Sequence, residues 1–165
     1  MFSRWIILFI LSFLVWGLLS WPPDWQHLLV GAFVAALVAY VIGDMFVKRP
    51  HLFGHPMRYL WFLYYLPVFL WEMLKANIDV AYRVAHPTLP IKPGIVKVKT
   101  SLKSDTGLTF LANSITLTPG TMTVDIDREK GLLYIHWINV EDKDVEGATK
   151  RIVRKFEDIL TRIFE

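Results

Sequence analysis

The stretch WIILFILSFLVWGLLSW, residues 5–21, contains no ionisable side chain. As a helix that rises about 1.5 Å per residue it covers about 25 Å, close to the minimum for crossing the hydrocarbon core of a bilayer. Trp5 and Trp21 stand at its two ends, and tryptophan favours the membrane–water interfaces. A cleaved signal peptide is the alternative, but Arg4 alone makes a weak basic start and no small-residue cleavage site precedes Trp21. We therefore predict a first membrane-spanning helix over residues 5–21.

A second apolar stretch follows the short polar break PPDWQH. Residues 28–47 would form about 30 Å of helix, which matches the thickness of the hydrocarbon core. Small residues recur there at every fourth position and so share one helix face, which lets another helix approach closely. These residues are Gly31, Ala35, Ala39 and Gly43. We predict that residues 1–56 form a transmembrane helical hairpin, and that this packing face meets the first span or a helix of another subunit.

The basic residues predict how the hairpin is oriented. Lys48, Arg49 and Arg58 follow the second span, whereas the loop between the spans holds only Asp24. Loops rich in Lys and Arg stay in the cytoplasm, so both the N-terminus and the 48–58 loop are expected there. This orientation predicts a multi-pass protein of the plasma (inner) membrane whose C-terminal domain is cytoplasmic.

Residues 57–87 begin as an apolar stretch and then become amphipathic. Only 13 uncharged residues separate Arg58 from Glu72, and Pro67 interrupts them, so the stretch is short for a span. Four charged residues then recur at steps of three and four and form one polar stripe on a helix: Glu72, Lys75, Asp79 and Arg83. We predict a kinked amphipathic helix that lies at the cytoplasmic interface. A third span, which would place the C-terminal domain outside, is the alternative.

Two acidic residues could take part in ion handling, because a charge at membrane depth is costly and is usually functional. Asp44 lies one helical turn before Lys48, with which it can pair near the lipid headgroups. Glu72 begins the polar stripe of residues 57–87. Since no series of further ionisable residues accompanies either one, the sequence favours ion pairing over an ion path for both.

Composition excludes several classes of function. The chain has no cysteine, so it has no disulfide, thiolate nucleophile or Cys-based metal site. The five histidines show no metal-binding spacing, and no phosphate-loop, dinucleotide or nucleophile-elbow motif occurs. From Ile91 onward, 12 Lys and Arg are balanced by 11 Asp and Glu, a net charge of +1, which does not indicate a nucleic-acid-binding surface. We therefore expect no enzyme, cofactor, metal or nucleic-acid function, and no small-molecule substrate bound by this chain alone.

Residues 88–165 have the length and mixed polarity of a small folded domain. Alternation of apolar and polar residues predicts three strands, over residues 95–100, 122–127 and 133–140. A turn at Lys130-Gly131 would join the last two strands into a hairpin.

Two helices complete the expected domain. Ser104 and Asp105 can cap a helix that ends near Leu117. An apolar stripe from Val145 to Ile163 predicts one last helix. The opposite face of this helix is basic, and we interpret it as facing solvent; contact with anionic lipid is the alternative. The expected fold is a membrane α-helical N-terminal half with a small C-terminal α+β domain of order β-α-β-β-α.

The run ANSITLTPGTMTVDID, residues 112–127, followed by LYIHWINV, residues 133–140, closely resembles the E subunit of the Mrp-type multisubunit sodium/proton antiporters. FLWEMLKANIDVA, residues 69–81, and PGIVKV, residues 93–98, are similar to the same family. The spans match it only in hydropathy. The residues of the family motif are Ala112, Asn113, Ser114, Ile115, Thr116, Leu117, Thr118, Pro119, Gly120 and Thr121. Within the motif, Pro119 can stop a helix, Gly120 permits a positive φ, and the threonines can bond to local backbone.

The resemblance implies a small subunit of a plasma-membrane complex that exchanges cytoplasmic Na⁺ for external H⁺. Its partners would be the other membrane subunits of the antiporter and the lipid bilayer. Because the chain shows no ion path of its own, we expect an accessory, structural role. The equivalent subunit of an antiporter-like module in a membrane-bound hydrogenase-type complex is one alternative, and a membrane-tethered adaptor for a cytosolic partner is another.

Overall fold

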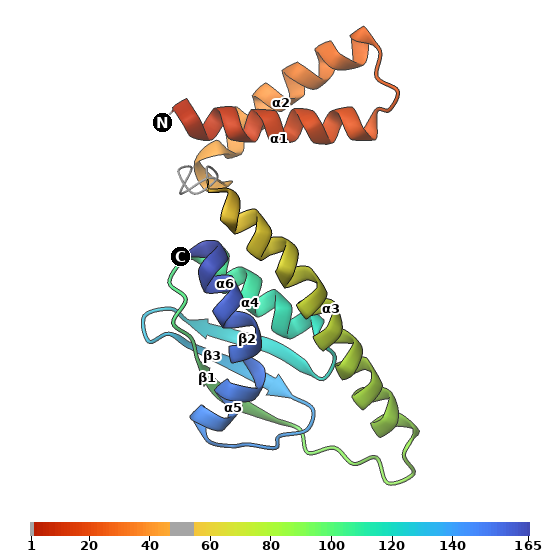
Figure 1. The fold of residues 1–165 in the computed structure, drawn as a ribbon, viewed down its shortest axis with the longest axis vertical. Coiled ribbons are helices and arrows are strands. Elements are labelled where there is room, and N and C mark those ends of the chain that lie inside the picture. Colours follow the sequence, from red (N-terminus) through yellow and green to blue (C-terminus); the bar gives the residue numbers. More distant parts are fainter. Residues whose placement is uncertain (1, 47–54) are drawn as a thin grey trace. The chain divides into compact units, whose positions relative to one another are not determined.

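The computed structural model describes residues 2–46 and 55–165. The chain consists of two compact units, Met1–His55 and Pro56–Glu165 (Figure 1).

The N-terminal unit is a pair of helices, α1 (Phe2–Leu19) and α2 (Trp25–Phe46). Within α2, the 19 residues Trp25–Gly43 are long and apolar enough to cross a membrane, whereas Trp5–Leu19 of α1 is a shorter apolar helix. The Asp24 carboxylate accepts a hydrogen bond from the His27 N–H at 2.8 Å and so caps the start of α2. The described residues thus contain one clearly apolar helix of spanning length, and the hairpin with two spans stays a prediction.

The C-terminal unit contains a small sheet and helices, which confirms this part of the predicted fold. Its elements are α3 (Pro56–Ala85), β1 (Gly94–Lys99), α4 (Asp105–Leu117), β2 (Thr121–Asp127), β3 (Leu132–Trp137), α5 (Val145–Ile152) and α6 (Arg154–Phe164). The Ser104 side chain accepts from the Gly107 N–H at 3.1 Å and caps α4 as predicted. The single last helix that the apolar stripe predicted is two helices, because the helical hydrogen-bonding pattern is interrupted at Val153.

The three strands form an antiparallel sheet in the order β1-β3-β2. Ile135 of the central strand β3 lies opposite Val96 of β1 and Thr123 of β2. Each outer strand has a backbone N–H that donates to a threonine hydroxyl of a helix: Thr149 of α5 accepts from the Lys99 N–H at 2.9 Å, and Thr116 of α4 accepts from the Thr123 N–H at 3.1 Å. These bonds tie α5 to β1 and α4 to β2.

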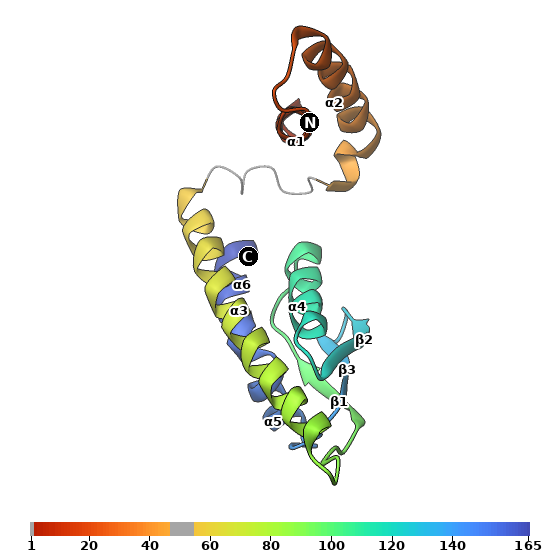
Figure 2. The same ribbon diagram turned by 90° about the vertical axis from the view of Figure 1, so that its right-hand side faces the viewer.

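The C-terminal unit has three layers. α4, α5 and α6 cover one face of the sheet and bury alternate strand residues such as Val98 and Leu133. α3 packs on the outer side of α4 and α6, and α3 and α6 run side by side in both views (Figures 1 and 2). Tyr65 of α3 belongs to the same buried core as Phe156 of α6, so α3 is an integral part of this unit.

Candidate functional site

The family motif, residues 112–121, closes the C-terminal end of α4. The Thr118 hydroxyl donates to the Ser114 carbonyl at 2.7 Å. The Thr121 hydroxyl donates to the carbonyls of Ile115 at 2.7 Å and Thr118 at 3.0 Å. The last carbonyls of a helix lack partners within the helix, so these hydroxyls stabilise the end of α4.

Gly120 brings this turn into close contact with two other segments. Its φ is +89°, in the left-handed region that glycine adopts readily. Its carbonyl accepts from the Ile138 N–H at 2.8 Å. A Cβ at this position would lie 2.9 Å from a methyl of Ile138 and 3.5 Å from a methyl of Val80 in α3. The motif therefore fits closely between the segment after β3 and α3.

Ser114 of the motif anchors α3 through a buried hydrogen bond. The Tyr65 phenol oxygen lies 2.6 Å from Ser114 Oγ. Because the Ser114 hydroxyl donates to the Phe110 carbonyl, the phenol is the donor to Ser114. Burial raises the pKa of Tyr65, so the phenol stays protonated and can donate.

The remaining motif residues lie along the outer edge of the domain. Ala112, Asn113 and Thr116 line an open groove between α4 and β2, and Asn113, Thr116 and Leu117 are exposed. The motif thus has a buried side that contacts α3 and the sheet, and an exposed side next to β2.

A cavity of about 160 Å³ lies between the motif turn, α3 and the helices α5 and α6. The turn contributes Thr118, Pro119, Gly120 and Thr121 to its lining. The charged side chains that line it are Asp79, Arg83, Glu141, Arg151 and Lys155.

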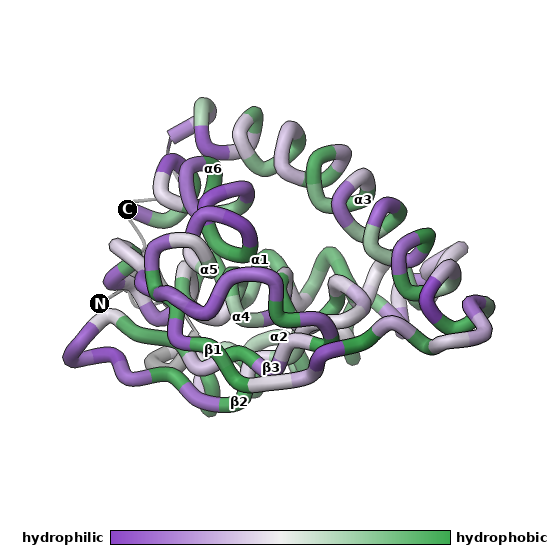
Figure 3. Tube along the Cα trace, turned by 90° about the horizontal axis from the view of Figure 1, so that it is seen from below, coloured by the Kyte–Doolittle hydropathy of each residue, from purple (hydrophilic) through white to green (hydrophobic). Residues whose placement is uncertain are grey.

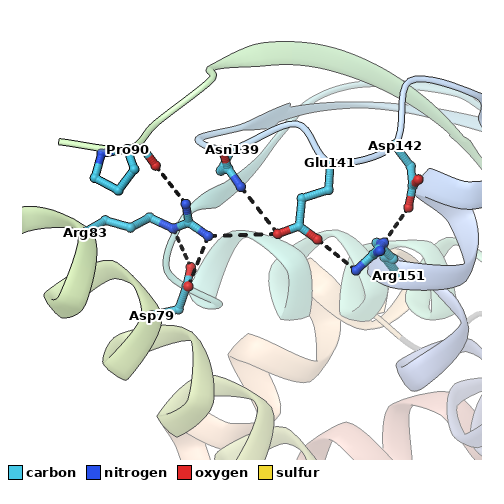
Figure 4. Close-up of polar contacts among 7 residues, drawn as sticks. All are labelled: Asp79, Arg83, Pro90, Asn139, Glu141, Asp142 and Arg151. Atoms are coloured by element: carbon cyan, nitrogen blue, oxygen red, sulfur yellow. Dashed lines mark hydrogen bonds and ion pairs between the residues drawn. The ribbon is translucent and has the colours of Figure 1, made fainter. Parts of the chain in front are cut away.

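Arg83 is the centre of the polar contacts beside this cavity (Figure 4). Its guanidinium donates to the Asp79 carboxylate at 2.8 and 3.0 Å and to the Pro90 carbonyl at 2.8 Å. A further contact of 3.9 Å joins it to Glu141, which follows β3. The hydrogen bonds from Arg83 to Asp79 raise the pKa of the guanidinium. Arg83 therefore connects α3 both to the segment that leads into β1 and to the segment that follows β3.

Arg151 of α5 extends the same network (Figure 4). It pairs with Glu141 at 2.7 Å and with Asp142 at close range. Asp79, Arg83, Glu141, Arg151 and Asp142 thus form a series of contacts in which positive and negative groups alternate. Alternation compensates each charge locally, so the network joins segments of the fold and leaves little net charge for a ligand.

Glu72 forms a second ion-pair site between α3 and α6. Its carboxylate contacts Lys155 of α6 at 3.2 Å and also Lys75, and 16% of its side chain is exposed. Burial alone would raise the pKa of Glu72, but the two ammonium groups outweigh burial and hold the pKa below its usual value. A group that carries protons needs a pKa near the working pH, so Glu72 is better suited to holding α3 against α6.

The small-residue face of α2 lies against α1. Gly31, Ala35, Ala39 and Gly43 are all buried. A Cβ at Gly31 would overlap the Trp16 ring, so this ring occupies the space above the glycine. The Trp16 indole N–H also donates to the His27 carbonyl at 2.9 Å. Among the described residues, the face meets the first helix of its own chain.

Asp44 lies in the last turn of α2, but its side chain and the predicted partner Lys48 are outside the described part of the structure. Among the residues described, no three His, Asp or Glu side chains are grouped so that they could hold a metal ion. The hydrogen bonds and ion pairs described above hold α3 against the C-terminal domain.

The sequence predicted which residues of α3 share a polar face, but it did not predict their partners in the rest of the C-terminal unit. The spacing of Glu72, Asp79 and Arg83 indicated that they share a helix face, but not what that face meets. On the basic face of the last helices, Arg151 and Lys155 are held in ion pairs that the spacing of the sequence did not indicate. The pairing of Tyr65 with Ser114 left no signal in the spacing of the sequence.

A chain with a helix that is apolar enough to cross a membrane and a separate α+β unit has the organisation of a membrane protein. The chain belongs to the family described as Na⁺/H⁺ ion antiporter subunit, which matches residues 9–163. This membership confirms the resemblance that the motif carried.

Similar proteins cover most of the chain. The E subunit of the Na⁺/H⁺ antiporter of Alkalihalophilus pseudofirmus is 39% identical over 130 residues, 76% of this chain and 78% of that protein. The E subunit of the Na⁺/H⁺ antiporter of Bacillus subtilis is 32% identical over 152 residues, 90% of each chain. Among solved structures, this chain is similar to a chain of the membrane-bound sulfane sulfur reductase, which is an archaeal respiratory membrane complex. The two superpose with a TM-score of 0.86 at 48% identity, over 98% of this chain and 99% of that one.

Proposed function

We propose that this chain is the E subunit of a multisubunit Na⁺/H⁺ antiporter of the plasma membrane, and that it supports the exchange of cytoplasmic Na⁺ for external H⁺ without an ion path of its own. The observation that carries the proposal is the family match over residues 9–163. The membrane half supports the accessory role, because between Trp5 and Val47 the only carboxylate or imidazole groups are Asp24 and His27, at the turn between the helices, and Asp44, near the end of the second span. Ion transfer through hydrocarbon needs a series of such groups.

The proposed subunit has two spans, over residues 5–21 and 28–47, and a cytoplasmic C-terminal domain. The basic residues Lys48, Arg49 and Arg58 support this orientation. The packing of α3 argues against a third span. Glu72 and Arg83 of α3 pair with Lys155 and Glu141 of the C-terminal domain. If α3 crossed the bilayer with these ion pairs intact, the domain would have to enter the hydrocarbon with it.

Thiol labelling tests the orientation. Lys143 and Lys150 are exposed and can each be replaced by cysteine in a chain that has none of its own. A membrane-impermeant thiol reagent should leave both cysteines unmodified in intact cells and react after the membrane is permeabilised. Labelling in intact cells would place the C-terminal domain outside and would contradict the proposed topology.

Extraction of the native assembly tests the function. Mild detergent should release the chain together with other membrane subunits, as native mass determination can show. The released assembly should exchange Na⁺ for H⁺ in liposomes, whereas the purified chain alone should not. Isolation of the chain as a single species under conditions that preserve exchange activity would contradict the proposal.

A second candidate is the equivalent subunit of a respiratory membrane complex. The observation that favours it is the 48% identity, over 98% of this chain, to a chain of the sulfane sulfur reductase complex. The same extraction separates the two candidates. Sulfur reductase activity in the assembly that carries this chain would favour the respiratory complex, and its absence in an assembly that exchanges Na⁺ for H⁺ would favour the antiporter.

A further inference from the structure

One side of α3 is apolar and uncovered along the whole helix. Its large side chains are each at least half exposed: Leu60 60%, Leu63 64%, Leu70 54%, Leu74 50%, Ile78 63% and Tyr82 61%. We call these six residues the outer face of α3. Consecutive members are three, four or seven residues apart, which places them on one stripe of the helix. A continuous exposed apolar surface of this kind marks a contact with a membrane or another protein.

The charged residues of α3 are distributed unevenly around the helix, and Figure 3 shows how hydrophilic and hydrophobic residues alternate along it. Both acidic residues are held in ion pairs, Glu72 with Lys155 and Asp79 with Arg83. The outer face itself contains no acid. Cationic groups lie at its sides: Lys75, which also pairs with Glu72, is 51% exposed, and the exposed Arg162 of α6 lies 4.3 Å from the ring centre of Trp61.

The chain also limits where α3 can start. Only residues 47–55 separate Phe46, the end of α2, from Pro56, the start of α3. Ten Cα–Cα steps span at most about 35 Å, so the chain allows α3 to start at the membrane surface where a spanning α2 would end.

From these observations we propose that the outer face of α3 lies in the headgroup region of the bilayer, with the helix parallel to the membrane and the C-terminal domain on its water side. Apolar residues with tyrosine and tryptophan on one side of a helix are typical of interfacial helices, and basic groups at the sides favour anionic lipid. Tyr59, Tyr64 and Trp71 are exposed on α3 and add aromatic rings suited to this depth. The proposal holds for either of the two candidate assemblies.

Spin labels on the full chain test this placement. Single cysteines at Leu63, Leu70 and Ile78 sample the outer face from end to end, and exposed Glu146 on α5 serves as the control. The labelled chain is reconstituted into vesicles of phosphatidylcholine and phosphatidylglycerol. Collision rates are then measured with oxygen, which concentrates in lipid, and with a water-soluble nickel chelate.

The proposal predicts that oxygen collisions exceed nickel collisions at all three outer positions and to a similar extent, with the reverse at Glu146. A depth that rises to a maximum near Leu70 and falls on both sides would show that α3 crosses the bilayer. Water-like collision rates at all three positions would show that the face is not on lipid and is left for a protein partner. Either of these results would overturn the proposal.

As a second measurement, Leu70→Glu places an acid on the outer face, while Glu146→Gln changes a charge on the control surface. Leu70→Glu should lower the oxygen collision rate at a label on Ile78, and Glu146→Gln should leave it unchanged. Equal rates in the two variants would contradict the proposed contact with lipid.

Discussion

The hydrogen bond between Tyr65 and Ser114 gives the sharpest test of how α3 is held on the domain. Both side chains are buried, with exposed fractions of 6% and 1%. Replacement of either partner removes the same hydrogen bond, but the two changes leave different groups behind. In Tyr65→Phe, the Ser114 hydroxyl still donates to the Phe110 carbonyl. In Ser114→Ala, the Tyr65 phenol loses its acceptor in a buried place.

The magnitudes follow from this difference. Loss of a satisfied hydrogen bond costs about 0.5–1.5 kcal/mol, so Tyr65→Phe should lower the free energy of unfolding by that amount. A buried donor without an acceptor costs about 1–3 kcal/mol, so Ser114→Ala should be the more damaging change. The double variant removes the stranded phenol, and its stability should return to about that of Tyr65→Phe.

Hydrogen exchange followed by mass spectrometry on the full chain in detergent measures these differences locally. Because about 1.4 kcal/mol corresponds to a tenfold change in an equilibrium constant, a cost of about 1–3 kcal/mol in Ser114→Ala should speed exchange of the α3 amides by about 5- to 140-fold. Tyr65→Phe should speed it less. Equal effects of the two single changes, with a double variant equal to their sum, would refute the assigned direction of the hydrogen bond.

Three further predictions concern other parts of the structure. Gly120→Ala should lower the free energy of unfolding by about 1–3 kcal/mol because it adds a methyl at a positive φ against Ile138; an unchanged melting temperature would contradict this close approach. The depressed pKa of Glu72 contributes stability that is present above pH 4.5 and lost as the pH falls below it. Glu72→Gln should therefore flatten the loss of stability that urea unfolding measures as the pH falls from about 5 to about 3, and parallel curves would count against the ion pairs. Ala35→Leu should weaken cross-linking between cysteines placed in α1 and α2, whereas Ala36→Leu, at an exposed position, should not; equal cross-linking would remove the case for a packing face.

Local signals predicted much of the C-terminal unit. The alternation of apolar residues located all three strands, and the capping residue Ser104 located the start of α4. The central position of β3 could not be predicted, because β1 pairs with a strand more than 30 residues further along the chain. The break at Val153 also had no signal, since no glycine or proline stands there and Ile152 and Val153 are both buried.

The polar stripe of α3 shows why the site was harder to predict than the helix. Spacing at three and four residues predicts which side chains share a face, because it depends only on helix geometry. What the face meets depends on residues far away in the sequence, such as Lys155 for Glu72 and Glu141 for Arg83. The acidic residue that was weighed as an ion-handling group is, in the structure, part of the contact between α3 and α6.

The central claim is that the chain supports exchange without carrying ions, and the most direct test is Na⁺-driven proton flux through the assembled complex. Asp44→Asn and Glu72→Gln remove the two acidic candidates in turn, and flux is compared after the amount of assembled complex has been matched. We predict that each variant complex keeps substantial exchange activity. Complete loss of exchange in a fully assembled complex with Asp44→Asn would place this subunit on the ion path and contradict the account.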